Sequence, residues 1–268
     1  MTKCNLHTHS TFCDGCDELE KTVLSAIKLG FDSLGFSGHS YTDFDLRYCM
    51  SKEDTGVYIL KINKLKEKYK DKIEIYCGLE KDYYSCDNNK FDYKIGSVHY
   101  FMKDGNFHDV DASKEELLNA VNDFYNGDIY SCIEDYFSTV ANLKRKTNCD
   151  IIGHFDLIKK FNYNNSMFDD TDKRYVNSAI GAVTQLLNEE VIFEYNTSGM
   201  RKNVKQMYPA DFILKEIAQK KGKVIITSDC HSCELLDYGF DDAKEKLISL
   251  GFKSVVVLSG GKFIEQKI

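Results

Sequence analysis

Short apolar segments that end in a histidine or an acid recur along the whole chain of 268 residues. Glu80 closes such a segment in IEIYCGLEKD, and Asp229 closes another in KVIITSDCH. Apolar runs of about four to eight residues that are bounded by turn residues are typical of buried strands. Six of the seven histidines occupy the same kind of position, and these are His7, His9, His39, His99, His154 and His231.

Amphipathic stretches separate these segments, so strands and helices alternate along the sequence. The expected strands cover about 3–9 and 33–39, two runs that end at residues 80 and 99, a run that ends at residue 154, and 191–199, 223–231 and 254–261. The expected helices cover 18–30, 55–70, 113–126, 133–147, 172–189, 210–221 and 241–250.

This alternation predicts an α/β fold with parallel strands joined by right-handed crossovers. No linker or repeat divides the sequence, so we expect one domain over residues 1–268. Seven or eight strand–helix units in an undivided chain favour a closed barrel of the TIM type over an open sheet. The polar residues would then meet at the C-terminal face of the strands, where barrel enzymes place their active sites.

Composition excludes several classes of partner and compartment. The formal net charge of −7 argues against a nucleic-acid-binding groove, which usually presents a basic face. No apolar run approaches the roughly 20 residues of a membrane span. The first residues, MTKCNLHTH, lack the apolar stretch of a signal peptide. We therefore expect a cytoplasmic protein whose ten cysteines are reduced. The oligomeric state stays open.

The strand-end residues are suited to metal binding. His7 and His9 are two residues apart on an expected strand, so both side chains point to one face and can bind one ion. Asp14 follows in a loop where Gly15 permits a sharp turn. Imidazole and carboxylate groups are ligands of zinc, iron and manganese. Nine candidate ligands exceed the needs of one tetrahedral ion and suffice for two or three. They are His7, His9, Asp14, His39, Glu80, His99, His154, Asp229 and His231.

A single histidine at a strand end is more often a core or surface residue than a ligand. The joint pattern of six histidines with interleaved acids favours a metal-dependent hydrolase. The seventh histidine, His108 in KDGNFHDVD, lies in a polar segment, where we expect a solvent-exposed loop.

The motifs H-x-H-x₄-D-G, G-H, G-x-E, S-V-H-Y, G-H-F-D and S-D-x-H occur in this order over nearly the whole chain. In this respect the chain resembles the polymerase and histidinol phosphatase (PHP) superfamily. The resemblance implies a distorted (β/α)7 barrel with three divalent ions at its C-terminal face. It implies one ion at His7, His9, Glu80 and Asp229, a second at Glu80, His99 and His154, and a third at Asp14, His39 and His231.

Within the superfamily, the chain most resembles the histidinol-phosphate phosphatases. This resemblance implies hydrolysis of L-histidinol phosphate, a small phosphate ester, with Glu80 and Asp229 as catalytic carboxylates beside the attacking hydroxide. It also implies phosphate contacts in GHFDLIKKF and EYNTSGMRK. The implied contacts are Ser198, Arg201 and either Lys159 or Lys160, where the group has an arginine. A lysine there supplies charge without the bidentate fork of arginine.

Three alternatives stay open at this point. One is a related phosphoesterase that acts on nucleotides or other small phosphate esters. A second is an amidohydrolase, which also begins with H-x-H but usually uses a carbamylated lysine where Glu80 stands here. The third is a metal-binding module without catalytic activity. This alternative is disfavoured because all the ligand positions are filled.

Overall fold

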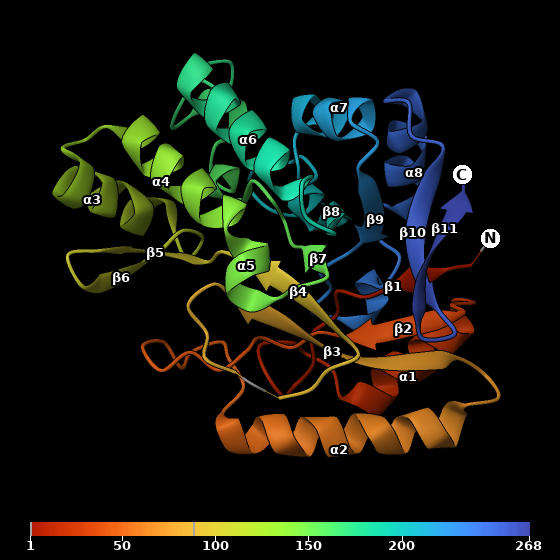
Figure 1. The fold of residues 1–268 in the computed structure, drawn as a ribbon. Helices are drawn as coiled ribbons and strands as arrows, with labels where there is room; N and C mark the ends of the chain where they lie inside the picture. The colour runs from red at the N-terminus through yellow and green to blue at the C-terminus, as the bar shows by residue number, and fades with distance from the viewer. Residues whose placement is uncertain (1, 88) are drawn as a thin grey trace.

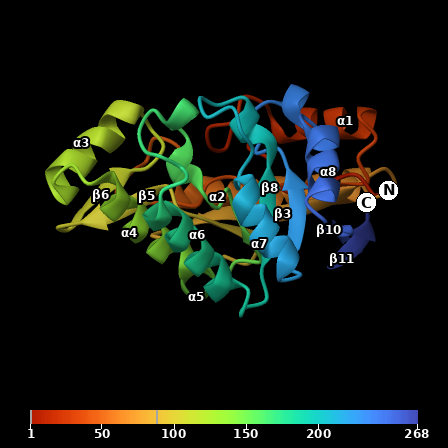
Figure 2. The same ribbon diagram turned by 90° about the horizontal axis from the view of Figure 1, so that it is seen from above.

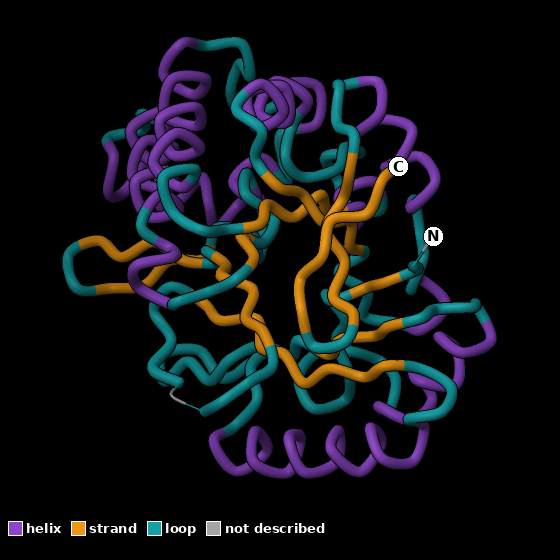
Figure 3. Tube along the Cα trace, turned by 45° about the vertical axis from the view of Figure 1, so that its right-hand side comes forward, coloured by secondary structure: helices purple, strands orange, loops and turns teal. Residues whose placement is uncertain are grey.

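Seven parallel strands form the centre of the computed structural model, which describes residues 2–87 and 89–268. Their order is β1 (Cys4–Asn5), β2 (Ser33–Phe36), β3 (Glu74–Asp82), β4 (Tyr93–Ser97), β7 (Ile151–Ile152), β8 (Ile192–Asn196) and β9 (Lys223–Thr227). A parallel bridge between Thr8 and Cys230 joins the segments that follow the first and last strands. The sheet thus curls into a nearly closed barrel, seen as a ring of strands in Figure 3. The predicted seven-unit barrel is confirmed.

Helices surround this barrel, with α2 on one side and α6, α7 and α8 on the opposite side (Figure 1). In α2, the Ser51 side chain caps the first turn by accepting a hydrogen bond from the Asp54 N–H. The helices are α1 (Leu19–Lys28), α2 (Lys52–Tyr69), α3 (Lys114–Tyr125), α4 (Ile129–Ala141), α5 (Leu143–Thr147), α6 (Lys173–Leu186), α7 (Asp211–Gln219) and α8 (Phe240–Ser249). The single helix expected over 133–147 is wrong: it is divided at Asn142 into α4 and α5.

The barrel interior is closed by Tyr93, which projects from β4 and is almost completely buried. Its hydroxyl donates to the carbonyl oxygens of Leu6, which follows β1, and Phe36, which ends β2. Gly35 and Gly78 leave room for the ring, because a Cβ at either position would overlap it. One aromatic side chain thus ties together the first four strands.

The apolar run expected as an eighth strand has a different role. It forms β10 (Ser254–Ser259), which turns at Gly260 and Gly261 into the antiparallel partner β11 (Lys262–Lys267). Both glycines have positive φ, which suits a two-residue hairpin turn. Val256, Val257 and Leu258 pack against interior residues of the barrel strands. Contacts of the hairpin turn with Glu74, at the start of β3, place it at the N-terminal end of the barrel.

A second hairpin was missed by the sequence analysis. Strands β5 (Tyr100–Lys103) and β6 (Asn106–Asp109) pair around Asp104 and Gly105, and they extend from the barrel beside α3 (Figure 2). The solvent-exposed loop expected for His108 is therefore wrong. His108 lies in β6, half-buried between the rings of Phe101 and Phe124.

The ten cysteines are free thiols in this structure. Among the described residues, no helix combines the length and the apolar character that crossing a bilayer requires.

Candidate metal centre

The nine candidate ligands converge at the C-terminal end of the barrel. His39 follows β2, Glu80 lies within β3, His99 follows β4, and Asp229 follows β9. Asp14 reaches the same place because its loop folds tightly against Ser10, and a Cβ at Gly15 would overlap the Ser10 backbone. A cavity of ≈ 200 Å³ opens here, and seven of the nine candidates are in its wall. His7 and His9 lie beneath, almost completely buried.

Glu80 is at the centre of this group and is almost completely buried. Its Oε1 lies 2.9 Å from His154 Nε2 and 3.3 Å from His99 Nε2. Its Oε2 lies 3.0 Å from His39 Nδ1 and 3.3 Å from His7 Nε2. The two oxygens of one carboxylate therefore face different sets of histidines.

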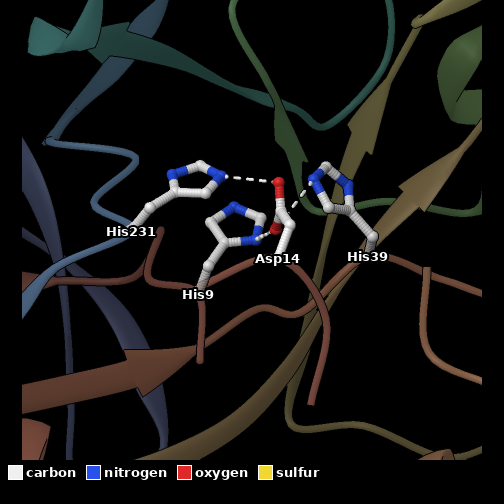
Figure 4. Close-up of side chains that lie close together, drawn as sticks. All are labelled: His9, Asp14, His39 and His231. Carbon is white, nitrogen blue, oxygen red and sulfur yellow. Dashed lines mark hydrogen bonds and ion pairs between the residues drawn. The ribbon is translucent and has the colours of Figure 1, made fainter. Parts of the chain in front are cut away.

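A second carboxylate, Asp14, organises the outer part of the centre (Figure 4). Its Oδ2 lies 3.0 Å from His231 Nε2, and its Oδ1 lies 3.4 Å from His9 Nδ1 and 3.6 Å from His39 Nε2. Asp14, His39 and His231 are the residues that the PHP resemblance implies for the third ion. His9 lies within reach of this set as well as of Asp229.

Several of these atoms are of the kind that binds a metal. Although other candidate ligand atoms lie close to them, His7 Nε2, His9 Nε2, Asp14 Oδ1 and Glu80 Oε2 are buried and make no hydrogen bond of suitable geometry. Buried polar atoms normally have partners, so these orphaned atoms call for an explanation. Two ligand atoms that are each about 2.1 Å from a tetrahedral ion lie roughly 3.4 Å apart. The distance from His9 Nε2 to Asp229 Oδ1 is 3.3 Å, and that from His7 Nε2 to Asp229 Oδ1 is 3.6 Å. The residues present therefore fit divalent ions.

The electrostatics keep the acids in the form that binds cations. Burial opposes ionisation of Glu80, but the nearby His39, His7 and His99 outweigh it and hold its pKa well below the usual range. For Asp229, burial is likewise outweighed by His7, His9 and His231 together, and its pKa is also well below the usual range. Both carboxylates are therefore anionic at neutral pH.

Comparison with known proteins agrees with this geometry. The family model described as PHP domain matches residues 5–198. The chain belongs to the PHP domain family. The resemblance found in its motifs is thus confirmed.

Two curated relatives have the same printed name, histidinol-phosphatase. The Bacillus subtilis protein is 28% identical, over 92% of this chain and 100% of its own length. The Lactococcus lactis protein is 24% identical, over 100% of this chain and 98% of its own. A solved structure of histidinol phosphate phosphatase from Lactococcus lactis, complexed with Zn, L-histidinol and phosphate, has a TM-score of 0.75 at 21% identity and covers 98% of this chain and 99% of that one. At this identity, the likeness supports the fold.

The residues expected to contact phosphate in this PHP chain divide into two groups. Ser198 and Lys160 are in the wall of the metal-centre cavity. Ser198 Oγ donates to Asp229 Oδ2 at 3.0 Å, and Lys160 Nζ pairs with Asp111 Oδ2 at 2.9 Å. These two side chains can reach a ligand at the metal centre.

Lys159 and Arg201 point elsewhere. Lys159 is buried, where its Nζ pairs with Asp156 Oδ2 at 3.0 Å and donates to the Met207 carbonyl at 3.2 Å. Arg201 donates through Nη2 to the Ser228 carbonyl at 2.7 Å and lies over the Tyr238 ring. Among the described residues, the cavity wall contains Lys202 but neither Lys159 nor Arg201.

Two functional candidates were missed in the sequence. One is the pair Asp109 and Asp111, which the second hairpin brings into the cavity wall. The other is Glu194, a completely buried acid in β8 whose Oε1 lies 2.6 Å from His7 Nδ1. A charged residue inside the apolar run VIFEYN was a usable signal, because buried acids are rare unless they are paired.

Proposed function

We propose that this chain is a metal-dependent histidinol-phosphatase, which hydrolyses L-histidinol phosphate to L-histidinol and phosphate. The observation that carries the proposal is the set of orphaned imidazole and carboxylate atoms that converge beneath one open cavity. The names of the curated relatives, and the zinc, histidinol and phosphate in the Lactococcus lactis complex, support the same substrate and zinc as the metal.

Three ions are proposed. The first would be held by His7, His9, Glu80 and Asp229, the second by Glu80, His99 and His154, and the third by Asp14, His39 and His231. Divalent ions supply Lewis-acid activation of water and neutralise charge on phosphate oxygens. Glu80 and Asp229, as anionic carboxylates, are the catalytic residues that orient the attacking water. Zinc, iron and manganese all suit this ligand set.

The remaining charges of the cavity match two charged groups of the substrate, its phosphate and its ammonium. Lys160, Lys202 and the Ser198 hydroxyl are placed to bind a phosphate group that faces the metal ligands. Cations that contact the phosphate also stabilise the charge that it carries during transfer.

Asp109 and Asp111 are in the same wall and are not among the proposed ligands. Asp109 pairs with Arg47 at 3.0 Å through Oδ2, and Asp111 pairs with Lys160 through Oδ2. We assign these carboxylates to the ammonium group of histidinol phosphate. A nucleoside monophosphate has no such cation to place beside these carboxylates. This distribution of charge favours histidinol phosphate over a nucleotide substrate.

Phosphate release by the metal-loaded protein tests this function. The panel contains L-histidinol phosphate, its analogue without the amino group, a nucleoside monophosphate and a sugar phosphate. We expect the highest kcat/KM for histidinol phosphate, with a loss of about tenfold or more when the ammonium group is removed. Faster hydrolysis of the nucleotide would contradict the proposed substrate, and no hydrolysis of any ester would contradict the phosphatase function.

A further inference from the structure

Glu194 lies on β8 at the floor of the metal centre, with a side chain that is completely buried. Its Oε1 contacts His7 Nδ1 and accepts from Thr227 Oγ1, each at 2.6 Å. Its Oε2 accepts from the His154 N–H at 2.6 Å and from Asn196 Nδ2 at 3.0 Å. One carboxylate thus contacts groups that follow or belong to β1, β7, β8 and β9.

These contacts determine which nitrogen of His7 carries the proton. A carboxylate only accepts hydrogen bonds, and its two oxygens offer about four lone-pair positions. The backbone N–H of His154, the Asn196 amide and the Thr227 hydroxyl fill three of them as donors. The fourth neighbour, His7 Nδ1, is then also a donor. In the neutral imidazole that binds a metal, the proton on Nδ1 leaves the Nε2 lone pair bare, and Nε2 is the orphaned atom that faces Glu80 and Asp229.

We propose that Glu194 is a positioning residue, which holds His7 in its metal-binding tautomer and fixes the backbone of His154 beside it. A carboxylate behind a metal-ligating imidazole orients the ring and raises the basicity of the free nitrogen. Glu194 therefore strengthens metal binding without contacting the ion or the substrate. The inference rests on the proposed metal site at His7 and does not depend on the identity of the substrate.

The test is competition for Zn²⁺ between the metal-free protein and a chromophoric chelator. Glu194→Gln keeps the shape but places an amide NH₂ against other donors. We expect the affinity for Zn²⁺ to fall by about 10- to 100-fold. Glu189→Gln, which alters a surface acid paired with Arg145, should leave the affinity unchanged. Equal affinities of the Glu194 variant and the parent would overturn the proposal, whereas failure of the parent to bind Zn²⁺ would overturn the metal site itself.

The variant Thr227→Val distinguishes the positioning of His7 by Glu194 from a merely structural role of Glu194. This change removes the side-chain hydrogen bond from Thr227 in β9 to Glu194 in β8 and keeps the contact between Glu194 and His7. We expect Thr227→Val to lower Tm while Zn²⁺ affinity stays at the parent value. If both variants lose affinity alike, Glu194 acts only by joining strands and the proposal fails.

The tautomer can also be read in the parent protein, whether or not Glu194→Gln folds. Long-range ¹H–¹⁵N correlation spectra of the zinc-loaded protein should show His7 with its proton on Nδ1. A His7 signal with the proton on Nε2 would overturn the assignment.

Discussion

The two ends of the barrel differ in almost every physical respect. At the C-terminal end, buried imidazoles and carboxylates lie close together, and several of their atoms lack hydrogen-bond partners. At the N-terminal end, Leu6, Ile95 and Ile225 pack against the side chains of β10 in an apolar cluster. Buried polar atoms without partners destabilise a fold, whereas buried apolar area stabilises it. The comparison indicates that one end provides the chemistry and the other provides the stability that the chemistry needs.

The largest expected effect is at the polar end. Glu80→Gln keeps the size of the side chain but removes the charge that faces both sets of histidines. We expect kcat/KM for histidinol phosphate to fall by about 10³-fold or more, because metal-assisted catalysis contributes several kcal/mol. Phosphate release measures this effect, and far-UV circular dichroism should show a retained fold. An enzyme with nearly parental activity would mean that Glu80 is not part of the centre.

The apolar end should respond in stability and not in catalysis. Leu258→Ala removes a side chain that is 2% exposed inside the cluster at β10. We expect the free energy of unfolding to fall by about 2–5 kcal/mol, with kcat/KM per folded molecule unchanged. Urea denaturation and an activity assay measure the two quantities. Ile264→Ser, on the exposed side of β11, is the matched control and should change stability by less than about 0.5 kcal/mol. A loss of activity in the Leu258 variant would show that the two ends are coupled.

A smaller effect tests which cationic side chain contacts the phosphate at the C-terminal end of the barrel. Lys202→Ala removes an ammonium group from the cavity wall. We expect kcat/KM to fall by about 10- to 100-fold, which corresponds to roughly 1.5–3 kcal/mol for a charged hydrogen bond. The metal content should stay at the parent value, as measured by elemental analysis.

Arg201→Ala sharpens this assignment. Because Arg201 donates to the Ser228 carbonyl outside the cavity wall, its loss should affect kcat/KM less than the loss of Lys202 does. Lys215→Ala, an exposed position on α7, is the control for charge alone. A larger effect at Arg201 than at Lys202 would restore Arg201 as the phosphate contact expected from the motif.

The sequence was sufficient to predict the barrel and the clustering of the nine candidate ligands. Both depend on the spacing of apolar residues along the chain and on the positions of polar residues at the ends of the strands. Apolar runs between amphipathic stretches indicate parallel strands, and the C-terminal ends of such strands meet at one face. Residues as distant as Asp14 and His231 could therefore be grouped in advance. The number and identity of the ions depend on finer geometry, and they stay predictions.

Other features depended on information that strand and helix patterns do not contain. An apolar run such as SVVVLS is equally compatible with a parallel or an antiparallel strand. The antiparallel pairing of β10 with β11 is set by the turn at Gly260 and Gly261. The position of His108 in strand β6 is set by the turn at Asp104 and Gly105. Lys159 and Lys160 are adjacent at a short 3₁₀ turn, and the backbone there sends one into the protein and the other to the cavity.

The apolar cluster at the N-terminal end has a consequence for synthesis of the chain. Leu6 emerges from the ribosome long before Val256 and Val257, which belong to the same apolar cluster. Contacts between such distant positions slow folding, because a long loop must close before they form. Until residues 254–258 are released, the interior of a growing barrel lacks its cover, and exposed apolar surface of this kind favours aggregation and chaperone binding. We therefore expect this barrel to complete its folding only after residues 254–258 have left the ribosome.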